Sequence, residues 1–323
     1  MDRFAITTKI LQGGDASRRI VTKWFRPLRK EVPLSSSKPI SLLLAHANGF
    51  HKEVWEPVIA MLALDSEQAK RKPLKKLSTR PCTHLPNPYL ASVAKEVQWA
   101  DNAKDILAIA SQLSENTTLI GAGHSYGGSS MVLAEVLRPF TFASVLSIDP
   151  AIAFNAEHFF SMDFRPVLKR RAHWETQEIA ADYFNNHPFF KVLDPKVREL
   201  HIRHGLRPTK SGEQPSGLVL KCPPEHEYAV FKASEVGAVW VRDHINEVQC
   251  PLRLLIGAKS HIYISPENAK QYRAVSPLSD MTIMDNTGHL VPMETPSTVA
   301  EEVARFIHHG LVHRNDSVGK SHL

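Results

Sequence analysis

Cysteine is scarce in this chain. Its 323 residues include only Cys82, Cys222 and Cys250. An odd number of widely separated cysteines favours neither a disulfide framework nor a zinc cluster. The sequence therefore predicts a protein of a reducing compartment that folds without disulfide bonds or a structural metal. We expect it to hold no metal or other cofactor.

Long hydrophobic runs and a strong charge of one sign are also missing. No segment approaches the roughly 18 uninterrupted apolar residues of a membrane-spanning helix, and the first residues lack the layout of a secretory signal. Lys and Arg number 39 against 33 Asp and Glu, and no basic helix with interleaved aromatics accompanies the net charge of +6. We expect no stable membrane insertion, no secretion and no nucleic-acid partner.

The apolar pattern switches repeatedly between strand and helix periods. Residues 4–10 and 19–25 alternate as two antiparallel strands, and 40–46 is a short apolar run followed by a helical pattern over 52–64. Later segments repeat the order: helix 100–113, strand 117–121, helix 126–137, strand 142–148, strand 252–257, a helix near 266–275, strand 281–284 and helix 297–308. This alternation predicts an α/β protein with a mostly parallel central sheet.

Residues 149–248 interrupt that rhythm with helical pieces, aromatics and several prolines. The simplest interpretation is a core of residues 1–148 and 249–311, a helical lid insertion over 149–248 and a flexible tail over 312–323. Residues 65–90 stand where a buried strand is due, yet they are basic and proline-rich. We expect a loop there, so that either another segment fills this place in the sheet or the sheet lacks a strand.

The sequence Gly123-His124-Ser125-Tyr126-Gly127 lies between a predicted strand and a predicted helix. This is the context of the Gly-x-Ser-x-Gly nucleophile elbow, in which glycines permit a tight, strained turn that projects the serine above the sheet. Ser125 is therefore the predicted nucleophile.

A serine nucleophile needs a general base, and a neutral imidazole is the usual one. His289 follows the last core strand within a Thr-Gly-His turn, in the chain order serine, acid, histidine of such proteins. The competitors His46, His51 and His261 lack that placement.

The loop 257–263, where an acid commonly stands, has no carboxylate. Asp149, at the end of the strand after the nucleophile, is the predicted acid that orients His289. A helix cap is the plainer interpretation of Asp149, and Asp285 and Glu294 are the fallback acids. For the oxyanion hole we expect the backbone N–H groups of Tyr126 and Asn48.

The last three residues, Ser321, His322 and Leu323, form a small-basic-Leu ending. Such tripeptides are read by the peroxisomal import receptor. We therefore expect that receptor as a partner and a peroxisomal location.

Several motifs together carry a family resemblance. They are His46-Ala47-Asn48-Gly49-Phe50, the Ser125 elbow with Gly128, Ser147-Ile148-Asp149-Pro150 and Thr287-Gly288-His289-Leu290-Val291-Pro292. The chain resembles the α/β-hydrolases of fungal peroxisomes: those of AK-toxin-type clusters and, as relatives, mycophenolic acid acyl-CoA hydrolase and yeast peroxisomal lipase. The resemblance implies an α/β-hydrolase fold, a Ser125-His289-Asp149 triad, fungal origin and a role in secondary metabolism.

These features favour a serine hydrolase that cleaves a small-molecule acyl ester or acyl-CoA thioester. We expect Phe50 and Trp174 to contact the substrate. Five basic lid residues could attract the phosphates of coenzyme A, although for each one a place on the solvated surface is the more common role: Lys169, Arg170, Arg171, Arg203 and Arg207. The alternatives are a degenerate hydrolase-fold protein that binds without turnover and a peroxisomal lipase.

Overall fold

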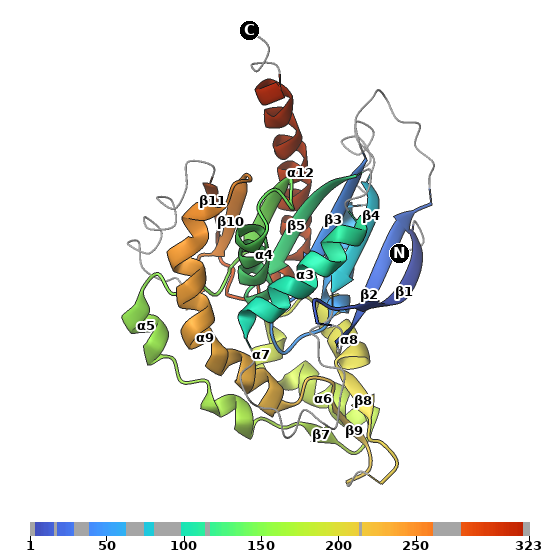
Figure 1. Cartoon of the computed structure of the whole chain (residues 1–323). Coiled ribbons are helices and arrows are strands. Elements are labelled where there is room, and N and C mark those ends of the chain that lie inside the picture. The colour runs from blue at the N-terminus through green and yellow to red at the C-terminus, as the bar shows by residue number, and fades with distance from the viewer. Residues whose placement is uncertain are drawn as a thin grey trace.

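The computed structural model describes residues 4–15, 18–28, 39–62, 74–80, 98–113, 117–212, 215–260 and 279–318. An eight-stranded sheet crosses the molecule in the order β1-β2-β4-β3-β5-β6-β10-β11 (Figure 1). Its strands are β1 (Phe4–Gln12), β2 (Arg19–Pro27), β3 (Ile40–Ala45), β4 (Leu74–Arg80), β5 (Thr118–His124), β6 (Ser144–Ile148), β10 (Leu252–Gly257) and β11 (Ser279–Met284). The strands from β4 to β11 run parallel, and β1 and β2 add an antiparallel edge. The predicted α/β class is confirmed.

The side chains of the central strands explain the layers. Leu43 points into a core shared with helices α3 (Trp99–Leu113), α4 (Tyr126–Leu137) and α9 (Pro224–His244). Leu42 and Leu44 point the other way, against α1 (Glu56–Leu62) and α12 (Pro296–Val318). Because neighbouring side chains of a strand face opposite sides, a continuous apolar run such as β3 can bury both. Figure 1 shows α3 and α4 on one face and α12 on the other.

The prediction that residues 65–90 form only a loop is wrong for part of that segment. Strand β4 lies between β2 and β3, antiparallel to the first and parallel to the second. The pairing supplies hydrogen bonds to the edge of β3 that β5 does not cover and that would otherwise lie unpaired in the interior. This gain outweighs the weak strand propensity of the β4 sequence. Residues 65–73 and 81–90 lie outside the described residues.

The insertion between β6 and β10 packs below the sheet in Figure 1. It contains the predicted helices and also a small three-stranded sheet in the order β7-β9-β8. Its remaining elements are α5 (Ala156–Ser161), η3 (Arg165–Lys169), β7 (His173–Trp174), α6 (Gln177–Asn186), α7 (Pro188–Lys191), α8 (Pro195–His204), β8 (Leu206–Pro208), β9 (Leu218–Leu220) and η4 (Ile245–Glu247).

Near the end of the chain, the structure describes only some of the predicted segments. Helix α12 continues to Val318, so the structure differs from the expected flexible tail over 312–318. The predicted helix near 266–275 and the terminal Ser321, His322 and Leu323 lie outside the described residues.

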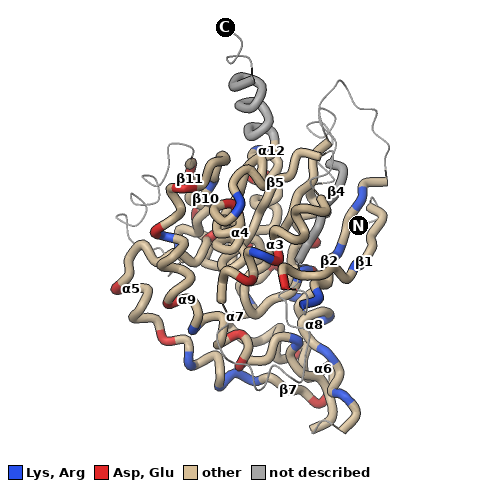
Figure 2. Tube along the Cα trace, viewed as in Figure 1, with Lys and Arg blue, Asp and Glu red and all other residues tan. Residues whose placement is uncertain are grey.

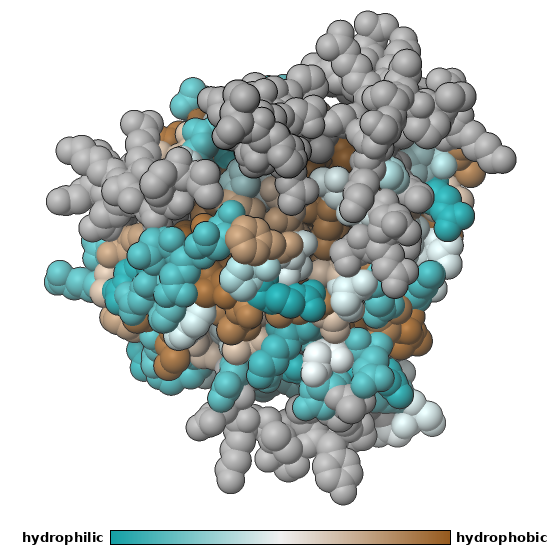
Figure 3. All heavy atoms as spheres, turned by 45° about the horizontal axis from the view of Figure 1, so that its top comes forward, coloured by the Kyte–Doolittle hydropathy of each residue, from teal (hydrophilic) through white to brown (hydrophobic). Residues whose placement is uncertain are grey.

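The exterior is of mixed character. Hydrophilic and hydrophobic side chains are interspersed over the face seen in Figure 3. Among the residues that the structure describes, no helix combines the length and the apolar character needed to cross a bilayer.

Candidate active site

The carboxyl ends of the parallel strands bring the predicted site residues to one edge of the sheet. Ala45, Gly123 and Ser147 are register partners on β3, β5 and β6, so the loops that follow these strands begin side by side. Ser125 follows β5 and Asp149 follows β6 directly, whereas His289 comes from the loop after β11. Ligand sites of open α/β sheets lie at this edge.

Ser125 occupies a strained turn. Its φ of 54° is in the left-handed region, which is costly for a residue with a Cβ, and its N–H donates to Ile148 O at 2.8 Å. A Cβ at Gly123 would collide with the backbone of Gly127, and a Cβ at Gly127 would lie 2.6 Å from His46 O. The two glycines of the motif are therefore required by close backbone approach.

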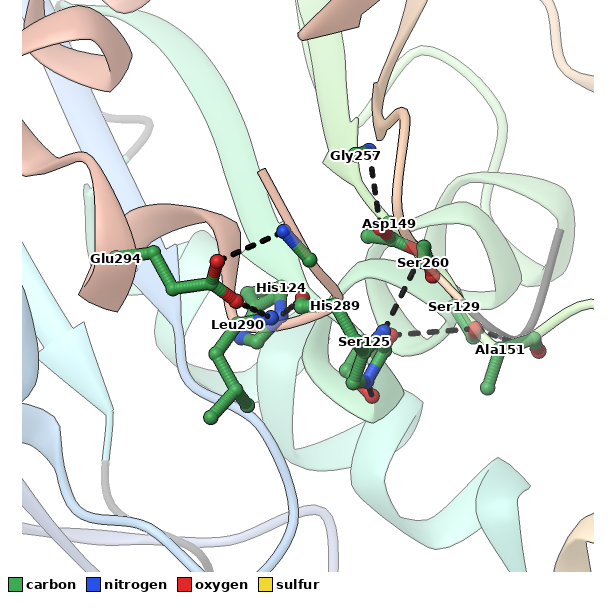
Figure 4. Close-up of polar contacts among 11 residues, drawn as sticks. His124, Ser125, Ser129, Asp149, Ala151, Gly257, Ser260, His289, Leu290 and Glu294 are labelled. Carbon is green, nitrogen blue, oxygen red and sulfur yellow. Dashed lines mark hydrogen bonds and ion pairs between the residues drawn. The ribbon is translucent and has the colours of Figure 1, made fainter. Parts of the chain in front are cut away.

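The three predicted residues form one chain of contacts (Figure 4). His289 Nε2 lies 3.0 Å from Ser125 Oγ, and His289 Nδ1 lies 3.3 Å from Asp149 Oδ1. Asp149 is fully buried, and Ser125 is 8% exposed. This geometry allows the imidazole to take a proton from the hydroxyl while the carboxylate faces its other nitrogen.

The last residue of β10 and a serine from the loop that follows it hold the Asp149 carboxylate. Ser260 Oγ donates to Oδ1 at 2.9 Å, and the Gly257 N–H donates to Oδ2 at 3.1 Å. Residues 257–263 contain no acid, as the sequence shows, but they supply two hydrogen-bond donors that the sequence does not predict. The one feature of the sequence that could have indicated this role is Ser260, a hydrogen-bonding residue in the loop where an acid commonly stands.

Asn48 and Tyr126, the predicted oxyanion donors, come from neighbouring loops. The contact of Gly127 with His46 O places the start of α4 against the end of β3. The Asn48 side chain donates from Nδ2 to Glu227 O at 2.8 Å, which ties this loop to the first turn of α9. Gly49, at φ 76°, leaves room for the Glu227 carboxylate.

Glu227 itself is 6% exposed and pairs with Arg170 from the lid. Burial raises the pKa of Glu227, and the neighbouring Arg170 opposes that rise. Two distant segments of the lid insertion are thus joined by an ion pair beside the loop that carries Asn48.

The competing histidines have other partners. His46 Nδ1 lies 2.8 Å from Ala47 O, and His51 Nδ1 lies 3.2 Å from Glu53 Oε2. His261 lies outside the described residues. Of the fallback acids, Asp285 is exposed, and Glu294 accepts the backbone N–H groups of Gly288 and Leu290.

The structure places Trp174, which is predicted to contact the substrate, inside the lid insertion. Trp174 is fully buried in the lid's own core, against Phe184 and Leu220 among others, so it has no free face for a ligand. Packing of the small lid sheet decides this, and the sequence pattern does not reveal it. Phe50 is half-buried, and its ring packs on that of His201.

The basic lid residues are largely occupied by acidic neighbours. Arg170 pairs with Glu227, Arg171 with Glu175 and Arg203 with Glu199. Figure 2 shows acidic and basic residues interleaved along the lid elements. A site for phosphate on the described lid would therefore have to compete with existing ion pairs.

No group of three or more His, Cys, Asp or Glu side chains within the described ranges is arranged to hold a metal ion. The site described above consists of the chain's own serine, histidine and carboxylate.

Comparison with known proteins agrees with this fold. The chain is 25% identical over 218 residues to the abhydrolase domain-containing protein AFT2-1 of Alternaria alternata, covering 58% of this chain and 82% of the relative. It is 24% identical over 199 residues to the type I acyl-CoA thioesterase mpaH' of Penicillium brevicompactum, covering 58% of this chain and 44% of the relative.

Among solved structures, the peroxisomal α/β-hydrolase Lpx1 of Saccharomyces cerevisiae superposes with a TM-score of 0.77 at 18% identity, covering 96% of this chain and 90% of that one. E-2-(acetamidomethylene)succinate hydrolase gives a TM-score of 0.70 at 16% identity, over 94% and 100%. The sequence model described as the alpha/beta hydrolase family matches residues 42–302. Since that match spans most of the chain, the protein belongs to the alpha/beta hydrolase family.

Proposed function

We propose that this chain is a serine hydrolase that cleaves an ester or an acyl-CoA thioester. The observation that carries the proposal is the line of contacts from Ser125 Oγ to His289 Nε2 and from His289 Nδ1 to Asp149. Ser125 is the nucleophile, His289 the general base and Asp149 the group that orients the imidazole.

In the first step His289 takes the hydroxyl proton as Ser125 Oγ attacks the acyl carbon. The N–H groups of Tyr126 and Asn48 stabilise the resulting oxyanion, and His289 returns the proton to the departing alcohol or thiol. Water then attacks the acyl-enzyme by the same route and releases the free acid. Apart from this water and the substrate, each step uses only groups of the chain.

Thioesters are the favoured substrate class. The similarity to a type I acyl-CoA thioesterase supports this choice, as does a C-terminus of the peroxisomal import type. The relatives from Alternaria and Penicillium support a place in the secondary metabolism of a fungus. On this proposal the protein is peroxisomal, and the import receptor binds Ser321, His322 and Leu323.

The rival proposal of a non-catalytic binder rested on a broken sheet. Strand β4 removes that reason, because it pairs with both of its neighbours. A lipase differs from a thioesterase in its substrate, so a screen of acyl-CoA, short esters and emulsified triacylglycerol separates these two.

The decisive experiment is labelling with a fluorophosphonate probe, followed by peptide mass mapping. We expect modification at Ser125 only, and loss of labelling in Ser125→Ala, whose kcat should fall on the order of a millionfold. The matched control is Ser144→Ala, because Ser144 is a buried serine of β6 whose Oγ has no hydrogen-bond partner among the described residues. A folded wild-type protein that resists the probe would contradict the proposal.

A further inference from the structure

The main chain around His289 is held by a carboxylate from the next helix. Glu294 ends α11 (Val291–Glu294), and its side chain turns back over the loop. Oε2 accepts the N–H of Gly288 at 2.7 Å and Oε1 accepts the N–H of Leu290 at 2.9 Å. One carboxylate therefore binds the N–H groups of the residues before and after His289 (Figure 4).

The carbonyl of His289 is held from the opposite side. His124 Nε2 lies 2.7 Å from His289 O. Burial lowers the pKa of His124 well below its ordinary value, with His289 and His46 adding to the effect, so this ring is neutral at pH 7. A carbonyl oxygen can only accept, which puts the single proton of His124 on Nε2.

We propose that Glu294 and His124 are positioning residues for the imidazole of His289. This inference rests on the proposed function. The two side chains fix the peptide group that follows His289, and Glu294 also holds the N–H of the residue before it. This restrained backbone sets the direction in which the ring of His289 leaves the main chain. A displacement of about 1 Å at a reacting group can cost about a hundredfold in rate, so this restraint bears directly on turnover.

We call the contacts of Glu294 and His124 with the backbone around His289 the clamp. The residue before His289 leaves space for it. A Cβ at position 288 would lie 2.8 Å from Glu294 Oε1, so glycine is the residue that lets the carboxylate approach. The carboxylate matters chemically because both of its oxygens accept. In Glu294→Gln the amide nitrogen would face a backbone N–H, leaving one partly buried donor without its acceptor.

The same chain offers a matched control. Glu135, in α4, accepts the N–H of Phe140 at 2.7 Å and that of Phe142 at 3.0 Å. Its carboxylate thus also binds the N–H groups of two residues that stand on either side of a third. It lies near the end of α4 opposite Ser125, about 15 Å away along the helix. Glu135→Gln thus removes an equivalent backbone clasp far from the site.

The first experiment measures kcat and KM with p-nitrophenyl butyrate, the fluorophosphonate labelling rate and the urea unfolding midpoint. We expect both Gln variants to lower the midpoint. Only Glu294→Gln should lower kcat and the labelling rate, by about 10- to 100-fold, with KM changed less than about twofold. Unchanged kcat in Glu294→Gln, or an equal loss in Glu135→Gln, would overturn the inference.

The second experiment uses His124 and does not depend on the folding of the Glu294 variant. His124→Phe keeps a ring but loses the donor, whereas His124→Gln places an amide N–H near the position of Nε2. We expect about a tenfold loss of kcat for Phe and recovery of most of it for Gln. Equal rates for the two variants would remove His124 from the clamp.

These outcomes separate the two proposals. If the wild type is labelled no faster than Ser125→Ala, the hydrolase proposal fails and the inference falls with it. If the wild type is labelled and Glu294→Gln is labelled at the same rate, only the inference fails.

Discussion

Asp149 shows how much a single side chain depends on its neighbours. Its φ of 39° is costly for a residue with a Cβ, and its carboxylate is buried. Three contacts compensate: the hydroxyl of Ser260, the N–H of Gly257 and the imidazole of His289. The Asp149 carboxylate is therefore held in place by three groups of the site.

We expect Asp149→Asn to lower kcat/KM by at least about a thousandfold, because an amide cannot keep the imidazole in the tautomer that accepts the serine proton. Steady-state hydrolysis of p-nitrophenyl butyrate measures this, with circular dichroism as the check on folding. A folded variant with a much smaller loss would move the acid role to another carboxylate.

At the scale of elements, β4 is the part of the sheet that local pattern did not predict. Segment 74–80 has the sequence Leu-Lys-Lys-Leu-Ser-Thr-Arg, with no β-branched run. Its place between β2 and β3 depends on partners that are distant in the chain. The basic and proline-rich sequence of residues 65–90 therefore does not show the pattern of a strand, although backbone pairing makes residues 74–80 one.

Ser78→Pro tests this strand, since Ser78 is the register partner of both Trp24 and Leu43. Proline cannot donate to a ladder, and it is excluded from central strands. We expect Ser78→Pro to lower the urea midpoint strongly or prevent soluble expression, while Ser78→Ala shifts the unfolding free energy by no more than about 1 kcal/mol. Equal stability of the two variants would place this segment outside the sheet.

At the scale of the whole molecule, buried histidines link stability to pH. Burial lowers the pKa of His51, His124 and His201 below the ordinary value of 6.5. For His201 the neighbouring His51 and Arg170 add to this, whereas Glu53 opposes it for His51. Below pH 6.5 the unfolded chain binds protons that the folded chain does not, so stability is full above that pH and declines below it.

We expect the free energy of unfolding to fall between pH 7.5 and 5.5, by up to about 1.4 kcal/mol per pH unit for each histidine. His201→Phe should reduce the slope without lowering stability at pH 7.5, because both ring nitrogens of His201 are buried without hydrogen-bond partners in the described structure. Its ring already stacks on Phe190 at 5.2 Å. Urea unfolding at a series of pH values measures both effects, and an unchanged slope would contradict the assignment.

The sequence by itself determined what depends on near neighbours along the chain. Alternating periods identified the strands of the large sheet other than β4 and the helices that pack on it. Gly-x-Ser-x-Gly between a strand and a helix identified Ser125 as the candidate nucleophile, because the turn's requirements are met within five residues. The chain order and the missing acid in loop 257–263 pointed to His289 and Asp149.

The tertiary structure alone decided what depends on contact between distant segments. It inserted β4 between β2 and β3, buried Trp174 in the lid and turned the carboxylate of Glu294 toward two amides. It also brought Ser260 to Asp149. Hydrogen-bond satisfaction and packing are settled only when the chain is folded, so no local pattern could have specified these partners.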